Sequence, residues 1–175
     1  NCIAIGLSSG FVEPLESTSI HLIMIAVTRL MQLFPFDGVT AALADRFNQL
    51  SRTELEGIRD FIILHYHLND RQGEPFWDGC RALDIPESLA SRIALFRESA
   101  TAFQASDELF RVDSWVQVML GQGLEPKAHH RLGQMIGRER LGRSLADLAQ
   151  GIGQAVAGLP SHQAFLDHLA APVAA

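Results

Sequence analysis

The chain has few cysteines, and they are not spaced as metal ligands. Among its 175 residues only Cys2 and Cys80 are cysteines, and they stand far apart. We interpret both as buried thiols of a protein in a reducing compartment. The sequence therefore predicts a cytoplasmic protein without a metal site.

Lysine and long apolar runs are also scarce. Lys127 is the single lysine, and the net charge is −6, which argues against a nucleic-acid-binding surface. The most apolar segment, residues 20–36, is interrupted by His21, Arg29 and Gln32. It falls short of the roughly 20 apolar residues that a membrane span needs. With 47% hydrophobic and 19% charged residues, the composition is that of a globular domain.

What the chain does contain is mostly the spacing of amphipathic helices. Apolar residues recur at this spacing over residues 17–33, and a second helix is expected over residues 39–50. Ser51 and Glu54 then have the spacing of a capping box, which would open a third helix ending near Leu68. Further helices are predicted after Pro75, over residues 87–99, 114–120 and 128–157, and from Pro160.

The segment from residue 6 to residue 21 is a small-residue loop between an apolar run and a helix. Residues 2–5 are all apolar and predict a short buried strand, and the helical pattern begins near Ser17. A strand, loop and helix in this order present free N–H groups and the positive end of a helix dipole to an anion. Glu13 and Glu16 lie in the same loop, so an anion site with acid–base groups is indicated.

A lone strand needs partners, and no second convincing strand follows in the sequence. We therefore expect the chain to be a C-terminal piece of a longer protein, whose N-terminal part carries the rest of the sheet.

Each residue of the loop also has a purely structural interpretation. Glu16 could be a first-turn carboxylate favoured by the helix dipole, and Glu13 a loop carboxylate that accepts nearby N–H groups. Ser8 and Ser9 lack a nearby His/Asp set in the sequence, so they are expected to be loop hydrogen-bond formers rather than nucleophiles. His21 is expected to pack beside the site.

Residues 6–18 closely resemble the signature of the flavin-dependent halogenases of the tryptophan halogenase family. The signature Gly-Leu-Ser-x-Gly-Phe-x-Glu-Pro-Leu-Glu-Ser-Thr is matched at Gly6, Leu7, Ser8, Gly10, Phe11, Glu13, Pro14, Leu15, Glu16, Ser17 and Thr18. Weaker similarity continues through residues 34–35, 61–68 and 118–124. The resemblance implies a mainly α chain, the C-terminal helical part of an α/β flavin-monooxygenase-like fold. Residues 1–20 would end the FAD-binding module, and residues 21–175 would form a helical substrate-binding part.

The resemblance also implies a reaction. Reduced FAD, supplied by a separate flavin reductase, reacts with oxygen, and chloride or bromide attacks the flavin hydroperoxide to give hypohalous acid. That acid halogenates an electron-rich arene such as an indole. The glycine-rich FAD fingerprint and the active-site lysine of the family are absent from these residues, so the chain by itself is expected to be inactive. Partners would include the arene and the reductase, and a homodimer is compatible with this interpretation.

The family's site residues carry over by position. The active-site glutamate falls on Glu16, and the halide-binding backbone amides fall on Thr18 and Ser19. The members that act on free tryptophan usually have glycine at the position of Ser19. Contacts to FAD would come from Gly10, Pro14, Ser17 and Thr18. Ser17 would also face the substrate, together with the aromatic residues Phe103, Phe110 and Trp115.

The substrate pocket departs from that of the members that act on free tryptophan. A rough alignment places Ala105 at a glutamate of those members and Trp115-Val116 at a pair of tyrosines. Free tryptophan is therefore expected to be a poor substrate, and an indole-like or larger arene a better one.

Three alternatives stay open at this point. The parent could be a flavin monooxygenase of similar fold, or the chain could be a helical binding or dimerisation module without catalysis. The aromatic residues Phe76, Trp77, Phe103, Phe110 and Trp115 could equally be ordinary core residues.

Overall fold

The structure is a computed structural model that describes residues 2–13, 15, 18–105 and 108–171. It divides into two compact units, one ending at His129 and the other beginning at His130. The first unit carries the loop with the family signature.

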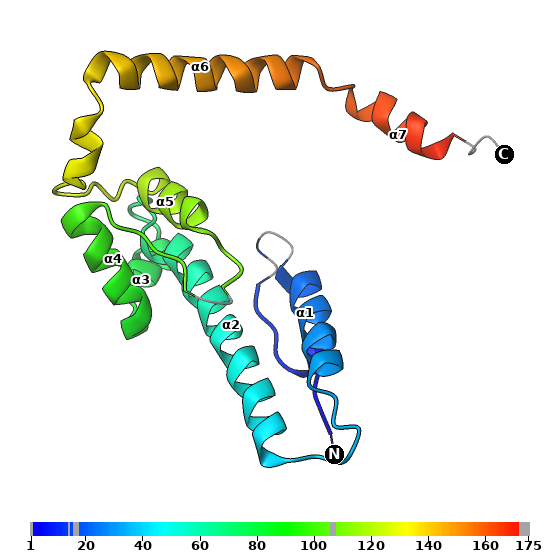
Figure 1. Ribbon diagram of the computed structural model, residues 1–175. Helices are drawn as coiled ribbons and strands as arrows, with labels where there is room; N and C mark the ends of the chain where they lie inside the picture. Colours follow the sequence, from blue (N-terminus) through cyan, green and yellow to red (C-terminus); the bar gives the residue numbers. More distant parts are fainter. Residues whose placement is uncertain (1, 14, 16–17, 106–107, 172–175) are drawn as a thin grey trace. The chain divides into compact units, whose positions relative to one another are not determined.

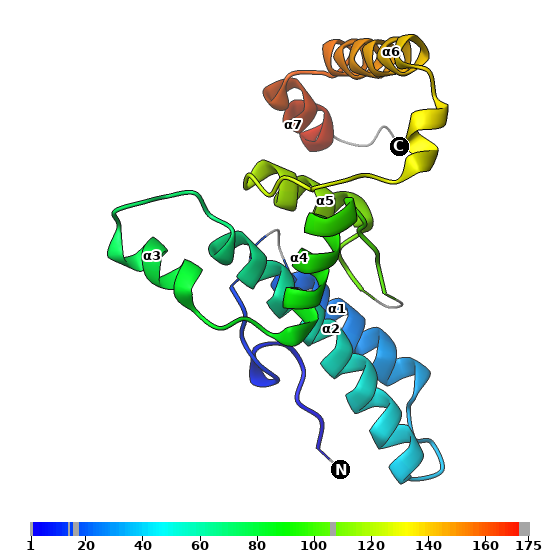
Figure 2. The same ribbon diagram turned by 90° about the vertical axis from the view of Figure 1, so that its left-hand side faces the viewer.

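Helices build the first unit almost entirely (Figures 1 and 2). A 3-10 turn, η1 (Gly6–Ser8), precedes α1 (Thr18–Gln32) and the long helix α2 (Ala41–His67). The shorter helices are α3 (Pro75–Ala82), α4 (Glu87–Ser99) and α5 (Val112–Gly121). The helix α2 is the central element, because α1, α3, α4 and α5 all contact it. The mainly helical fold class is thereby confirmed.

The strand predicted over residues 2–5 is not formed in the part of the chain that the structure describes. Ile5 has extended backbone angles, φ −133° and ψ 145°, but no described segment pairs with this stretch. A strand is stabilised by the ladder of a neighbouring strand, and here Ile3 is exposed instead. Cys2 is exposed and Cys80 half-buried, so the expectation of two buried thiols is wrong.

The two helices predicted over residues 39–68 are one continuous helix, α2. Thr40 caps it, since its side chain accepts a hydrogen bond from the Leu43 amide at 3.3 Å. The capping box at Ser51 and Glu54 is wrong because both residues lie inside the helix. The Glu54 carboxylate turns away from the backbone and makes a tertiary contact with α1.

The proline-based boundaries are confirmed. Pro75 is the first residue of α3, and Pro86 immediately precedes α4, as expected for a residue with a fixed helical φ and no N–H to lose. Helix α1 spans nearly the range predicted for it.

The hydrophobic core lies where α2, α4 and α5 meet. Phe61 at its centre stacks on Phe110, with ring centroids 3.7 Å apart, and meets the edge of Trp115 at 5.0 Å. Val12 and Leu15 of the loop pack against this core, which fixes the loop to the helical scaffold. The buried apolar residues are Ile58, Phe61, Ile62, Leu64, Leu89, Ile93, Phe96, Phe110, Trp115, Met119 and Leu124.

The second unit contains the 3-10 turn η3 (Arg131–Met135) and the helices α6 (Arg138–Ala157) and α7 (His162–Ala170). Ser161 caps α7 by accepting a hydrogen bond from the Ala164 amide at 3.2 Å. Every described side chain of this unit is exposed. In either unit, no helix among the described residues is long and apolar enough to cross a membrane.

Candidate functional site: the loop before helix α1

The predicted site residues fall partly outside the described residues. Pro14, Glu16 and Ser17 are outside the described residues, so their roles stay predictions. Gly10, Thr18 and Ser19 are described. Gly10 has φ +151°, an angle that favours glycine.

The first half of the loop is stabilised by its own serines. The Ser8 hydroxyl donates to the Ile5 carbonyl at 2.8 Å and accepts from the Ile5 amide at 3.2 Å. The Ser9 hydroxyl donates to the Gly6 carbonyl at 2.7 Å. Gly6 itself has φ +66°, a left-handed conformation natural for glycine. The interpretation of Ser8 and Ser9 as loop hydrogen-bond formers is confirmed.

Helix α1 begins at Thr18, directly after the loop. The backbone N–H groups of Thr18 and Ser19 therefore belong to the first helical turn, where amides have no intrahelical acceptor and the helix dipole is positive. The Thr18 side chain is buried, and its hydroxyl donates to the Glu13 carbonyl at 3.3 Å. A helix start of this kind suits a small anion.

Glu13 accepts hydrogen bonds at both its backbone carbonyl and its side-chain carboxylate. Its carbonyl also accepts a hydrogen bond from the Leu15 amide at 2.7 Å, and its carboxylate accepts one from the Tyr66 hydroxyl near the end of α2. That hydrogen bond, with desolvation and the negative charge of Glu13, raises the pKa of Tyr66. Tyr66 therefore stays a protonated donor.

A pocket of about 470 Å³ lies beside the loop, at the end of α2. Leu15 forms part of its wall, and Tyr66 and Trp77 contribute stacked rings with centroids 5.7 Å apart. His65 has its Nδ1 2.8 Å from the Phe61 carbonyl. Because a carbonyl can only accept, Nδ1 carries the proton of that bond and Nε2 is the other polar atom of the ring. The lining residues are Leu15, His65, Tyr66, Asn69, Asp70, Arg71, Trp77 and Gln122.

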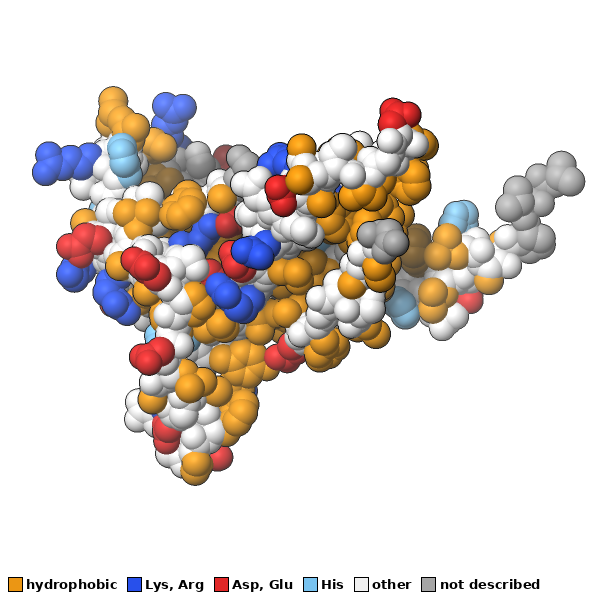
Figure 3. Space-filling model, turned by 90° about the horizontal axis from the view of Figure 1, so that it is seen from below, with side chains coloured by type: hydrophobic (Ala, Val, Ile, Leu, Met, Phe, Trp, Pro, Cys, Tyr) orange, Lys and Arg blue, Asp and Glu red, His pale blue; other side chains and the backbone are white. Residues whose placement is uncertain are grey.

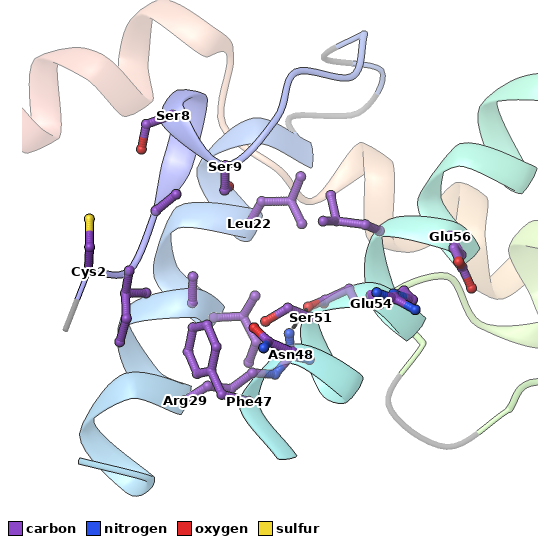
Figure 4. Close-up of a pocket in the computed structure, with 16 residues that line it drawn as sticks. Cys2, Ser8, Ser9, Leu22, Arg29, Phe47, Asn48, Ser51, Glu54 and Glu56 are labelled. Atoms are coloured by element: carbon purple, nitrogen blue, oxygen red, sulfur yellow. Dashed lines mark ion pairs between the residues drawn. The ribbon is translucent and has the colours of Figure 1, made fainter. Parts of the chain in front are cut away.

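A second pocket, of about 490 Å³, lies between the N-terminal segment, α1 and α2 (Figure 4). Its lining includes Arg29 and Glu54, whose Nη1 and Oε2 atoms are 2.6 Å apart. The other oxygen of Glu54 is 2.6 Å from His21 Nε2. The Glu54 and Arg29 side chains are 3% and 8% exposed, so this is a buried ion pair that joins α1 to α2. The sequence did not reveal this role for Glu54.

Of the three aromatic residues predicted for the substrate pocket, Phe103 and Trp115 line one small gap, and Phe110 is not among its lining residues. Phe110 and Trp115 are buried in the core, and Phe103 is half-exposed. The guanidinium of Arg92 fills the space between Phe103 and Trp115, 4.2 and 4.4 Å from the ring centroids. The remaining gap is too small for a water molecule. The core interpretation thus fits Phe110 and Trp115.

Among the described residues, Glu108 is an acidic residue near Ala105, and its carboxylate is already engaged. Its carboxylate pairs with Arg92 and accepts the Ala105 amide at 3.0 Å. No free carboxylate is therefore offered there by the described residues. Nor does any group of three His, Cys, Asp or Glu side chains among them come together as metal ligands.

Comparison with known proteins identifies the fold. The tryptophan halogenase family model matches residues 1–138. The tryptophan 7-halogenase RebH of Lentzea aerocolonigenes is 37% identical over 109 residues, which are 62% of this chain and 21% of RebH.

Two solved structures align over almost the whole chain. A flavin-dependent halogenase from Xanthomonas campestris is 43% identical, with a TM-score of 0.92 over 100% of this chain and 36% of its own. BrvH, a flavin-dependent halogenase from Brevundimonas sp. BAL3, is also 43% identical, with a TM-score of 0.90 over 97% of this chain and 34% of its own.

The fold is thus that of a part of flavin-dependent halogenases. Since the family model covers most of its residues, the chain belongs to the tryptophan halogenase family. It spans roughly a fifth of the curated relatives and a third of the solved structures that it matches.

Proposed function

We propose that the parent protein is an FAD-dependent halogenase that acts on an electron-rich arene of the indole type. The observation that carries this proposal is the family's signature loop, which runs directly into the start of α1 with Thr18 buried and tied to Glu13. The similar proteins are flavin-dependent and tryptophan halogenases, which supports the same chemistry.

Different residues of the loop would bind the halide, contact FAD and act on the arene. The backbone amides of Thr18 and Ser19 would hold the halide at the start of α1. FAD would be contacted by Gly10, Pro14, Ser17 and Thr18. Bound FAD would supply activated oxygen that converts halide into hypohalous acid. The Glu16 carboxylate would orient that oxidant and accept the proton of the arene.

We place the arene in the pocket beside Leu15, because it adjoins the loop and presents Tyr66, Trp77 and His65. Phe110 and Trp115 support this wall from within the core, since Phe61 contacts both of them and also meets the His65 ring edge-on at 4.8 Å. Phe103 is half-exposed, and we propose that it contacts the arene from the solvent side.

The FAD module would cover the outer face of α1. Ile20, Met24 and Met31 are 64%, 66% and 72% exposed along this helix, and Phe11 in the loop is 71% exposed. Figure 3, a view from below relative to Figure 1, shows that hydrophobic side chains are open to solvent at the surface. An exposed apolar helix face suits an interface with another domain. Residues 1–20 would complete the FAD module and residues 21–175 the substrate part. The compact units divide differently, because residues 1–129 form one unit and residues 130–175 the other.

Without that module the isolated chain would be inactive. The parent would take reduced FAD from a separate reductase and could assemble as a homodimer. A cytoplasmic location is proposed from the free thiols of Cys2 and Cys80.

The test is product analysis of the parent. Indoles and phenols are incubated with the parent, a flavin reductase, oxygen and bromide, and the products are examined by mass spectrometry. Brominated products are expected. Hydroxylated products alone would move the protein to the flavin monooxygenases, whose fold is similar.

A further inference from the structure

Glu13 has no part in the roles proposed above, yet among the described loop residues it is the one that joins the most elements. Its carbonyl accepts from the Leu15 amide at 2.7 Å and from the Thr18 hydroxyl at 3.3 Å. Its carboxylate accepts from the Tyr66 hydroxyl, which lies 53 residues further along the chain. One residue thus joins the loop, the first residue of α1 and the end of α2.

Tyr66 is itself held in place. Its ring stacks on Trp77 at an interplanar angle of 16°, and the guanidinium of Arg71 lies 4.4 Å from the Trp77 ring centroid. Phe76 packs edge-on against Tyr66, with centroids 6.4 Å apart. The hydroxyl that reaches Glu13 is therefore fixed by α3 as well as by α2.

We propose that Glu13 and Tyr66 form a clamp of two positioning residues that sets where the halide-binding start of α1 stands relative to the arene pocket. The clamp rests on the proposed function for its catalytic consequence. Tyr66 lines the pocket, and Glu13 is bonded to Thr18, so a shift of one moves the oxidant site relative to the substrate. Misplacement of a reacting group by about 1 Å can cost as much as 100-fold in rate.

The contacts favour positioning over proton transfer. A general acid or base must exchange its proton with a reactant, whereas the Tyr66 hydroxyl is committed to Glu13. The same hydrogen bond raises the pKa of Tyr66, so the hydroxyl remains a donor at every pH at which such an enzyme would be assayed.

The first experiment measures coupling in the full-length parent, as halogenated product formed per reduced FAD oxidised. Tyr66→Phe and Glu13→Ala should each lower coupling about threefold to tenfold, the range of one lost hydrogen bond, while the rate of FAD oxidation stays the same. Glu13→Gln should restore coupling, because its amide oxygen still accepts from Tyr66. The double variant Glu13→Ala with Tyr66→Phe should be no worse than either single variant.

The matched control is Glu98→Ala, which removes an exposed carboxylate paired with Lys127 at 2.8 Å and should leave coupling unchanged. Wild-type coupling in Tyr66→Phe would overturn the clamp. So would a Glu13→Gln variant as poor as Glu13→Ala, because the charge rather than the hydrogen bond would then matter.

The second experiment does not depend on halogenation. Tyr66 is the only tyrosine of the chain, so tyrosinate absorbance reports this residue alone. In the wild-type chain the midpoint should lie above the ordinary pKa of 10.0, and Glu13→Ala should lower it. Amide hydrogen exchange in the peptide over residues 10–19 should also quicken in Tyr66→Phe.

The two experiments separate two kinds of failure. A parent that makes no halogenated product would refute the proposed function, and the titration would still decide the clamp. Identical midpoints and unchanged exchange would overturn the clamp even if halogenation is observed.

Discussion

Replacing Glu54 by Gln should destabilise the first unit far more than an ordinary surface change. Glu54 and Arg29 are almost fully buried, and their charged atoms are 2.6 Å apart. Removing one partner of a buried ion pair leaves the other charge without compensation, at about 3–5 kcal/mol. The His21 contact adds little to this figure, because the His21 side chain is 34% exposed and solvent screens it. Arg29 also borders a pocket, which favours the lower end, about 3 kcal/mol.

The assay is thermal unfolding followed by tryptophan fluorescence, since Trp77 and Trp115 both belong to the first unit. For a chain of this size, about 3 kcal/mol corresponds to a fall in Tm of roughly 6–12 °C. Adding Arg29→Met to Glu54→Gln removes the stranded charge and should recover much of the loss.

Glu98→Gln is the control, because Glu98 and Lys127 are both 67% exposed and such pairs contribute about 0–1 kcal/mol. If Glu54→Gln lowered Tm no more than Glu98→Gln does, the buried ion pair would not be what joins α1 to α2.

Three further predictions follow from the loop and the pocket. Gly6→Ala should lower the free energy of unfolding by about 1–2 kcal/mol, because the backbone at Gly6 is left-handed with φ +66° and the new Cβ would lie 3.0 Å from Ile23 Cγ1. The control is Gly79→Ala in helix α3, which should be neutral or stabilising in thermal unfolding because no atom lies near its Cβ. The isolated 175-residue chain should lose FAD during gel filtration, and stoichiometric retention would contradict the proposed need for the FAD module. Indole should exceed free tryptophan in kcat/KM under one halide concentration, because Ala105 stands where the members that act on tryptophan have a glutamate and an ammonium group without a partner is costly to desolvate. A tenfold preference for tryptophan would contradict the alignment at Ala105 and would indicate that Asp70 and Arg71, which line the pocket beside Leu15, pair with the zwitterion.

Much of the helical pattern could be predicted because its signals are local. Pro75 and Pro86 mark helix starts through fixed backbone geometry, and α3 and α4 begin beside them. The break expected at Ser51 and Glu54 failed for a tertiary reason, since Glu54 bonds His21 and Arg29 on another helix. The strand over residues 2–5 failed because strands depend on partners, and no described segment supplies one.

The site was predictable only as far as its motif. The loop and the start of α1 at Thr18 could be located from the sequence, as could the hydrogen-bonding role of Ser8 and Ser9. The Tyr66 bond to Glu13 spans 53 residues, and no local pattern encodes such a contact. Among the aromatic residues, Trp77 lines the pocket and Trp115 is buried in the core, a difference in burial that depends on the whole fold.

The most direct test of the central claim compares wild-type parent with Glu16→Gln in a single turnover. Reduced FAD, oxygen, bromide and indole are mixed, and FAD oxidation and bromoindole are measured in the same reaction. FAD should oxidise at the same rate in both proteins, while bromoindole should fall by about 10²- to 10⁴-fold in the variant. Equal bromoindole from the two proteins would contradict the claim and leave Glu16 as a carboxylate at a helix start.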